Sequence, residues 1–134
     1  MRDIVVESQR DVVLDFGPIT RKNAAGVPVA INLAAVDTKL WFTVKETALD
    51  PYAMAKLAKT YVVTGGGPTT VGFLVTTPSS TTVPNGTITI ADTEIVTTDS
   101  ATYWVWDLTL EEPSGRRETV ERGAFKVIRS VTNP

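Results

Sequence analysis

Residues branched at the β-carbon occupy about every third position of this chain. Thr, Val and Ile together account for 46 of its 134 residues. Such side chains pack well on the pleated surface of a sheet and lose rotamer freedom in a helix. The composition therefore favours a β-rich fold. At this length we expect one domain, residues 1–134, with a core large enough to be stable alone.

The sequence contains no histidine and no cysteine. These residues supply the commonest proton shuttle at neutral pH, the most reactive thiolate, and most ligands for zinc and copper. We therefore expect a protein that is not an enzyme, with no cofactor and no metal site. The acidic residues Asp92, Glu94 and Asp99 lack the spacing of an EF-hand loop. An acid-only hydrolase would need two converging carboxylates, and no spacing among the 15 acidic residues selects a pair.

Charge and hydropathy argue against two classes of partner. The 13 basic and 15 acidic residues are mixed along the chain, for a net charge of −2, and form no basic stripe of the kind that binds nucleic acid. No run approaches the ~20 apolar residues of a membrane span, and acidic residues interrupt the N-terminal segment where a signal peptide needs an apolar run. We expect no nucleic-acid or membrane partner, and synthesis in a cytoplasm.

Alternation of side chains between two faces marks the predicted strands, and it is strict at residues 11–16 and 87–90. Residues 27–33, 39–45 and 101–110 gather apolar side chains on one face, residues 61–63 and 71–75 are further candidates, residues 118–121 are the expected hairpin partner of 101–110, and residues 124–131 form a last strand. Roughly seven to nine short strands, separated by turn signals and not by crossover helices, are typical of an antiparallel sandwich or barrel. The strongest two-residue hairpin signal is Asn85-Gly86.

One segment has helical spacing instead. Asp50 is a good N-cap, and Pro51 suits the first helical position, where no amide donor is needed. Apolar residues follow at positions 54, 57 and 58, on one helical face. The spacing predicts one short inserted helix over about residues 50–59, which must lean on the sheet because it is too short to hold alone.

The alternation also divides the aromatic residues between core and surface. The residues expected in the core are Leu40, Phe42, Trp104, Trp106, Leu108 and Phe125. Trp104 and Trp106 share a face, so the pair could alternatively form a stacking platform for a sugar or a partner. Trp41 lies between two inward residues and is a candidate interface anchor. Asp107, on the opposite face from the two tryptophans, could bind a cation or a partner's arginine, or could cap a backbone amide or pair with a basic group such as Arg122 or Lys126.

Several of these segments recur, in the same order, in a known group of proteins. They are Trp41–Lys45, the Asp50-Pro51 segment to Lys59, Gly86–Ile90, Trp104–Leu108, Gly123–Val127 and the closing Val131-Thr132. In this order they resemble the small immunoglobulin-like proteins and domains encoded among tail and baseplate genes of bacteriophages, such as the N-terminal domain of baseplate upper proteins. The resemblance covers most of the chain from about residue 11. It implies an all-β, immunoglobulin-like antiparallel β-sandwich.

The same resemblance implies a function. It suggests a non-enzymatic structural component of a phage virion, which docks on tail, baseplate or capsid subunits as an adaptor, attachment or decoration protein. Its partners would be other virion proteins, in a homo-oligomer or symmetric multi-copy assembly. The protein would be made in the host cytoplasm and reside in the virion. The alternative is a carbohydrate-binding or adhesion module that uses Trp41 or the Trp104/Trp106 pair.

Polar loops on a rigid β-fold are common binding surfaces, and free strands can extend a neighbour's sheet. The expected contact residues are Gly65, Gly66 and Gly67 in one loop, Thr81 and Asn85 in another, Trp41, and Ile4, Val5 and Val6 in an exposed N-terminal arm of about residues 1–9. Gly65–Gly67 is not a phosphate-binding loop, because no Gly-Lys-Ser/Thr ending and no helix follow it.

Overall fold

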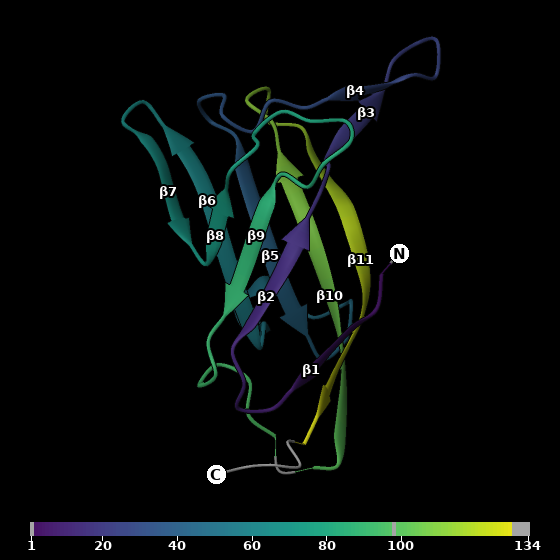
Figure 1. Cartoon of the computed structure of the whole chain (residues 1–134), viewed down its shortest axis with the longest axis vertical. Coiled ribbons are helices and arrows are strands. Elements are labelled where there is room, and N and C mark those ends of the chain that lie inside the picture. The colour runs from purple at the N-terminus through teal and green to yellow at the C-terminus, as the bar shows by residue number, and fades with distance from the viewer. Residues whose placement is uncertain (1, 98, 130–134) are drawn as a thin grey trace.

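The computed structural model describes residues 2–97 and 99–129, which form an all-β fold, as the composition predicts (Figure 1). The strands are β1 (Ile4–Glu7), β2 (Val12–Phe16), β3 (Thr20–Lys22), β4 (Pro28–Ala30), β5 (Lys39–Lys45), β6 (Leu57–Thr64), β7 (Gly67–Val71), β8 (Phe73–Val75), β9 (Gly86–Ile90), β10 (Ala101–Glu111) and β11 (Arg117–Ile128). Within the described ranges, the helical structure is a single 3₁₀ turn, η1 (Tyr52–Met54).

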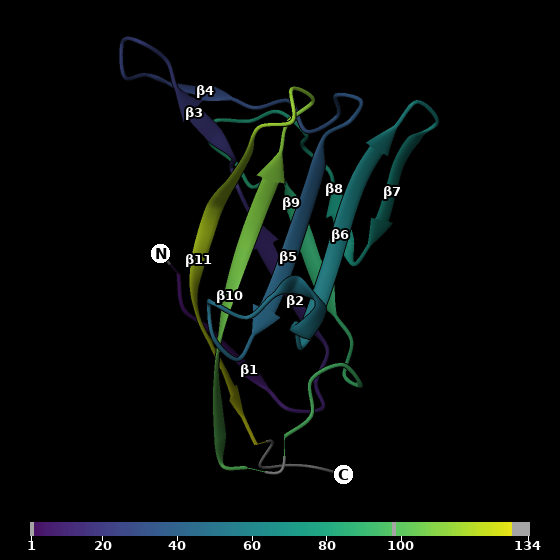
Figure 2. The same cartoon turned by 180° about the vertical axis from the view of Figure 1, so that it is seen from behind.

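The strands form three sheets. A six-stranded sheet has the order β1-β11-β10-β5-β6-β7, a three-stranded sheet has the order β2-β9-β8, and β3 pairs with β4. The six-stranded sheet curls around the three-stranded one, while the β3–β4 hairpin projects from the body (Figures 1 and 2). Among the strands of the described residues, the pairing is antiparallel except at one edge, where β1 runs parallel to β11. The expectation of a wholly antiparallel fold is therefore wrong at β1, and the large sheet is mixed.

The core lies between the two larger sheets. Of the residues expected there, Leu40, Phe42, Trp106, Leu108 and Phe125 are at most 2% exposed, and Trp104 is half-buried against the same cluster. The three-stranded sheet contributes Phe16, whose ring meets Phe73 edge-on at 5.3 Å between centroids. These residues reach the core because successive side chains of a strand point to opposite faces, and one face of each strand is turned away from water.

The predicted helix over residues 50–59 is wrong. Only Tyr52–Met54 form a 3₁₀ turn, and from Leu57 the chain continues as strand β6. Every second residue from Leu57 to Val63 is buried, so this segment follows the period of a strand. Met54, which belonged to the expected helical face, is 60% exposed. A helix of about ten residues is only marginally stable in water, whereas as a strand this segment pairs with β5 and buries every second side chain.

Two other boundaries differ from the sequence-based expectation. Asn85-Gly86 does not form a two-residue hairpin, because residues 76–85 are a longer loop between β8 and β9. The segments expected at 118–121 and 124–131 are one continuous strand, β11. Residues 130 and 131, and with them the Val131-Thr132 motif, lie outside the described residues.

Gly123 allows the segment just before β1 to lie close against β11. A Cβ at Gly123 would overlap the carbonyl oxygen of Arg2, which accepts a 2.8 Å hydrogen bond from Nε1 of Trp106. Trp106 is only 2% exposed, so this bond satisfies a buried donor. The absence of a side chain at position 123 therefore leaves room for the Arg2 backbone beside the last strand.

Gly123→Ala is expected to lower the free energy of unfolding by about 1–3 kcal/mol, because the Arg2 backbone must move. Tryptophan emission should shift to the red as Trp106 gains solvent. Urea unfolding followed by fluorescence measures both effects. Gly65→Ala is the control, since nothing lies within 4 Å of a Cβ added there. Equal stability of the two variants would contradict the role assigned to Gly123.

Candidate functional site

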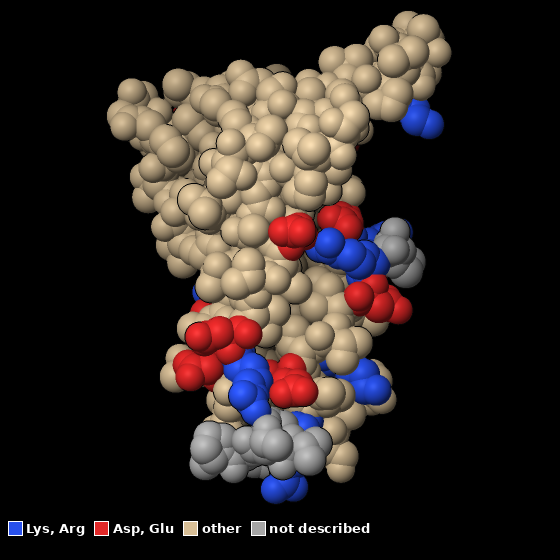
Figure 3. Space-filling model, viewed as in Figure 1, with Lys and Arg blue, Asp and Glu red and all other residues tan. Residues whose placement is uncertain are grey.

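One end of the molecule gathers loops and hairpins that carry no charge. Residues 23–36 and 60–91 contain no Asp, Glu, Lys or Arg. They include the tip of the β3–β4 hairpin, the β6–β7 hairpin and the 76–85 loop, at the upper end of Figure 1. Figure 3 shows the matching half of the surface almost free of charged groups, whereas charges of both signs gather on the lower half. We call the exposed parts of residues 23–36, 64–72 and 76–84 the neutral end.

Apolar side chains project from the neutral end. Val27, Val29, Val36, Val71 and Val83 are each about half exposed. Single exposed valines are common, but depletion of charge distinguishes the centre of a protein interface from the remaining surface. The neutral end combines this depletion with backbone turns and threonine hydroxyls, so it suits contact with another protein.

The projecting hairpin is fixed at its base by one arginine. Arg21 of β3 contacts carboxylate oxygens of Glu112 and Glu118, both at 2.6 Å. At the tip, Oδ1 of Asn23 accepts hydrogen bonds from the backbone N–H groups of Ala25 and Val27. An isolated two-stranded hairpin is barely stable in water. These contacts hold its shape and its angle to the body.

The predicted loop residues divide between the surface and the core. Gly65 and Gly66 form the exposed turn of the β6–β7 hairpin, Gly67 follows them, and Thr81 is exposed in the 76–85 loop. The prediction that Asn85 contacts a partner is wrong, because its side chain is fully buried. Its Oδ1 accepts a 2.8 Å hydrogen bond from the Ile19 N–H, and its Nδ2 donates one of 2.8 Å to the Thr77 carbonyl.

The prediction of an exposed N-terminal arm is also wrong. Ile4 and Val6 are 5% and 4% exposed, and β1 already pairs with β11 of the same chain. Val5 points outward and is 62% exposed. The N-terminal segment is therefore an edge strand of its own sheet, because Ile4 and Val6 gain more by packing in the core than by remaining free.

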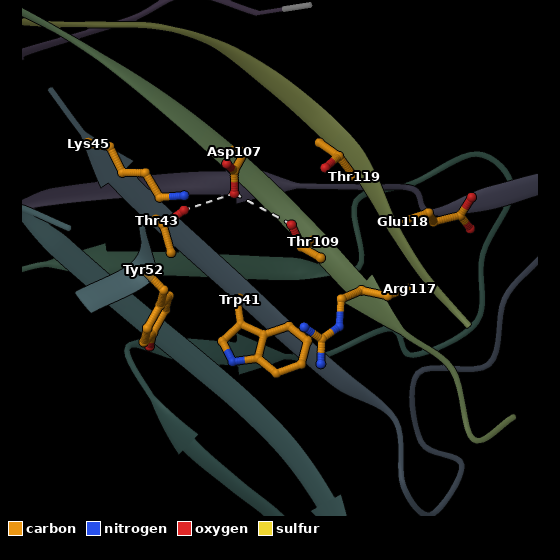
Figure 4. Close-up of a pocket in the computed structure, with 9 residues that line it drawn as sticks. All are labelled: Trp41, Thr43, Lys45, Tyr52, Asp107, Thr109, Arg117, Glu118 and Thr119. Atoms are coloured by element: carbon orange, nitrogen blue, oxygen red, sulfur yellow. Dashed lines mark hydrogen bonds between the residues drawn. The ribbon is translucent and has the colours of Figure 1, made fainter. Parts of the chain in front are cut away.

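Trp41 lies in a groove on the outer face of the six-stranded sheet (Figure 4). The groove has a volume of about 660 Å³, and we call it the Trp41 groove. Its lining residues are Trp41, Thr43 and Lys45 of β5, Tyr52 of η1, Asp107 and Thr109 of β10, and Arg117, Glu118 and Thr119 of β11. Alternation along β5 and β10 places these side chains opposite the core.

Hydrogen bonds and ion pairs order the polar part of this groove. Oδ1 of Asp107 accepts hydrogen bonds from the hydroxyls of Thr43, at 2.8 Å, and Thr109, at 3.5 Å. The Arg117 guanidinium lies 4.9 Å from the centroid of the Trp41 ring and donates to Glu111 at 2.7 Å. The hydrogen bond from Arg117 lowers the pKa of the Glu111 carboxyl, and Lys39 adds to this against the opposing effect of burial.

Glu94, one of the three acidic residues considered as calcium ligands, forms an ion pair with Lys59 instead. Both carboxylate oxygens of Glu94 accept hydrogen bonds from Nζ of Lys59, at 2.7 and 2.6 Å. Burial raises the pKa of Glu94, but the hydrogen bonds from Lys59 and from the Ala91 N–H, with the charge of Lys59, lower it overall. In the part of the chain that the structure describes, no three His, Cys, Asp or Glu side chains are grouped to hold a metal ion.

The chain matches no protein-family model, and no curated protein matches it. Over residues 2–97 and 99–129, no helix is long and apolar enough to cross a membrane. Inferences about function therefore depend on two surfaces, the neutral end and the Trp41 groove. The uncharged run from residue 60 to residue 91 is visible in the sequence and would have pointed to the first of them.

Proposed function

We propose that this protein is a non-enzymatic structural component of a phage virion, which docks through its neutral end on other virion subunits. The observation that carries the proposal is the absence of charge from residues 64–72 and 76–84, which lie at the same end as a projecting, anchored hairpin. Burying such a surface against another subunit would not strand an unpaired charge, which is the costly event at an interface.

The strand motifs resemble those of phage tail and baseplate proteins, and this resemblance supports a phage particle as the assembly on which the protein docks. We propose that the fold is a variant of the immunoglobulin-like sandwich, in which the larger sheet curls around the smaller. Support comes from a single core shared by strands of both sheets, with Phe73 of β8 meeting Tyr61 of β6 at 6.3 Å between ring centroids. Several copies around a symmetry axis would present the projecting hairpins in a ring.

Incorporation into particles tests this proposal. Antibodies raised against the purified chain should label phage particles purified from cultures that produce it, and the chain should sediment with them. Label confined to the soluble fraction would contradict the proposed function.

Charge substitutions then test which surface docks. Val29→Glu and Val83→Glu place a carboxylate at the neutral end, and each should reduce the amount incorporated by about tenfold or more. Val13→Glu is the matched control, since Val13 lies on β2, is 64% exposed, and should be incorporated normally. Equal incorporation of all three variants would exclude the neutral end as the docking surface.

A further inference from the structure

The Trp41 groove holds several polar groups that bond no other described residue. They are the indole N–H of Trp41, the ammonium group of Lys45, the hydroxyls of Tyr52 and Thr119, and Oδ2 of Asp107. The set contains both donors and acceptors, and all of these residues line the same groove (Figure 4). Such a set can satisfy a ligand that carries several hydroxyl groups, since each hydroxyl both donates and accepts.

The charges of the groove cancel. Arg117 is paired with Glu111, and Glu118 is paired with Arg21 and Arg116. The remaining charged groups, Lys45 and Asp107, have opposite signs. A groove without net charge gives little attraction for an anion or a cation, so the balance favours a neutral ligand over a phosphate or an acidic sugar.

Aromatic groups flank the opening. Tyr52 of η1 lies on one side and is 51% exposed, and Trp41 stands on β5 with the Arg117 guanidinium 4.9 Å from its ring centroid. Aromatic rings bind the C–H faces of a pyranose while the surrounding polar groups reach its hydroxyls.

A bulge in β11 places the Thr119 hydroxyl beside the groove. Leu108 pairs with Glu121 and Thr109 with Thr119, so Val120 is an extra residue in β11. A bulge of this kind changes the direction in which the neighbouring side chains point. Here Thr119 is exposed and lines the groove.

We infer that the Trp41 groove is a binding site for a neutral saccharide, with the sugar ring between Trp41 and Tyr52 and its hydroxyls bonded to Asp107, Lys45 and Thr119. This site is separate from the neutral end, so one surface can bind a glycan while the other is docked.

Titration with methyl glycosides of glucose, galactose, mannose and N-acetylglucosamine, followed by ¹H–¹⁵N NMR, tests the site. With at least one of them, the indole N–H signal of Trp41 should shift in a saturable way. The signal of Trp106 should stay in place, because that indole is buried and bonded to Arg2. Tyr52→Ala and Asp107→Asn should each raise the dissociation constant by about tenfold, the loss of about one good contact.

The matched control is Tyr103→Ala. Tyr103 is a 68% exposed aromatic of β10 with Lys126 5.4 Å from its ring centroid, but it does not line the groove. This variant should bind as the original protein does. The inference is overturned if no glycoside shifts the Trp41 signal, if the shifts persist unchanged in Tyr52→Ala and Asp107→Asn, or if sodium phosphate or N-acetylneuraminic acid binds more tightly than every neutral glycoside. Particle incorporation of Tyr52→Ala should be normal, so failure here leaves the proposed docking function to its own test.

Discussion

Glu94→Ala is expected to destabilise the protein by about 3 kcal/mol, because it leaves a buried ammonium group without its counter-ion. The side chain of Lys59 is only 7% exposed, and Glu94 is its ion-pair partner. Gly72 lies against the Lys59 alkyl chain, which restricts the routes by which the ammonium group could reach water. Urea unfolding monitored by circular dichroism measures the loss.

Lys59→Met separates the cost of the unpaired charge from the value of the pair. Methionine keeps most of the side-chain volume and carries no charge, and replacing buried ion pairs by apolar residues is often close to neutral. We expect Lys59→Met to cost less than Glu94→Ala, and the double variant to recover most of the stability that Glu94→Ala loses. A double variant less stable than Glu94→Ala alone would show that this account of the pair is wrong.

The ion pair also predicts a pH dependence. The pKa of Glu94 in the folded protein is below its ordinary value of 4.5. A carboxyl with a lowered pKa contributes stability that is present above the unfolded value and lost as the pH falls through the folded one. The free energy of unfolding should therefore decrease below about pH 4.5. In Glu94→Gln this decrease should be smaller, and an identical acid profile would contradict the prediction.

Asn85→Ala is expected to cost about 2–4 kcal/mol, because it leaves the buried N–H of Ile19 without an acceptor and the Thr77 carbonyl without its donor. The Asn85 side chain, at the end of the 76–85 loop, connects Ile19, just before β3, to Thr77 near the start of that loop. Its loss should therefore also raise hydrogen exchange in both segments, which mass spectrometry of deuterated peptides would detect.

Thr81→Ala is the control for Asn85, since Thr81 is exposed in the same loop. Its stability should lie within a few tenths of a kcal/mol of the original protein. If Asn85→Ala were equally stable and instead lost particle binding, Asn85 would act at the surface, against its burial in the structure.

Strands with one buried face could be predicted from the sequence. Alternation located β2, β5, β9 and β10 to within a residue or two, because a shift of one position would turn every apolar side chain to water. The same rule placed Leu40 and Phe42 in the core and Trp41 on the outer face.

The helix predicted near residue 50 is wrong for a physical reason. Its cap and proline signals are local, and they describe a turn as well as they describe a helix. The segment becomes a strand because β6 pairs with β5, and this pairing depends on residues outside the segment. Similarly, nothing near Ile4 indicates that its partner is Phe125.

The candidate sites depend on such distant pairings even more. The Trp41 groove combines side chains from three strands and from η1. The extra residue Val120 in β11 changes the direction of the neighbouring Thr119 side chain, which lines one side of the groove. The sequence showed Trp41 and Asp107 as outward residues but not that Tyr52, Lys45 and Thr119 join them. Asn85 looked like an exposed turn residue because its two bonding partners, Ile19 and Thr77, lie in other segments.

The parallel pairing of β1 with β11 gives the chain resistance to pulling. A tensile force applied between Arg2 and Arg129 runs along this ladder in shear, since the two strands point the same way and the force enters at opposite ends. The four residue pairs then share the load and must rupture together, whereas an antiparallel hairpin pulled at its open end would unzip one pair at a time. Extension of single molecules by these two positions should therefore require a higher force than extension across the β10–β11 hairpin.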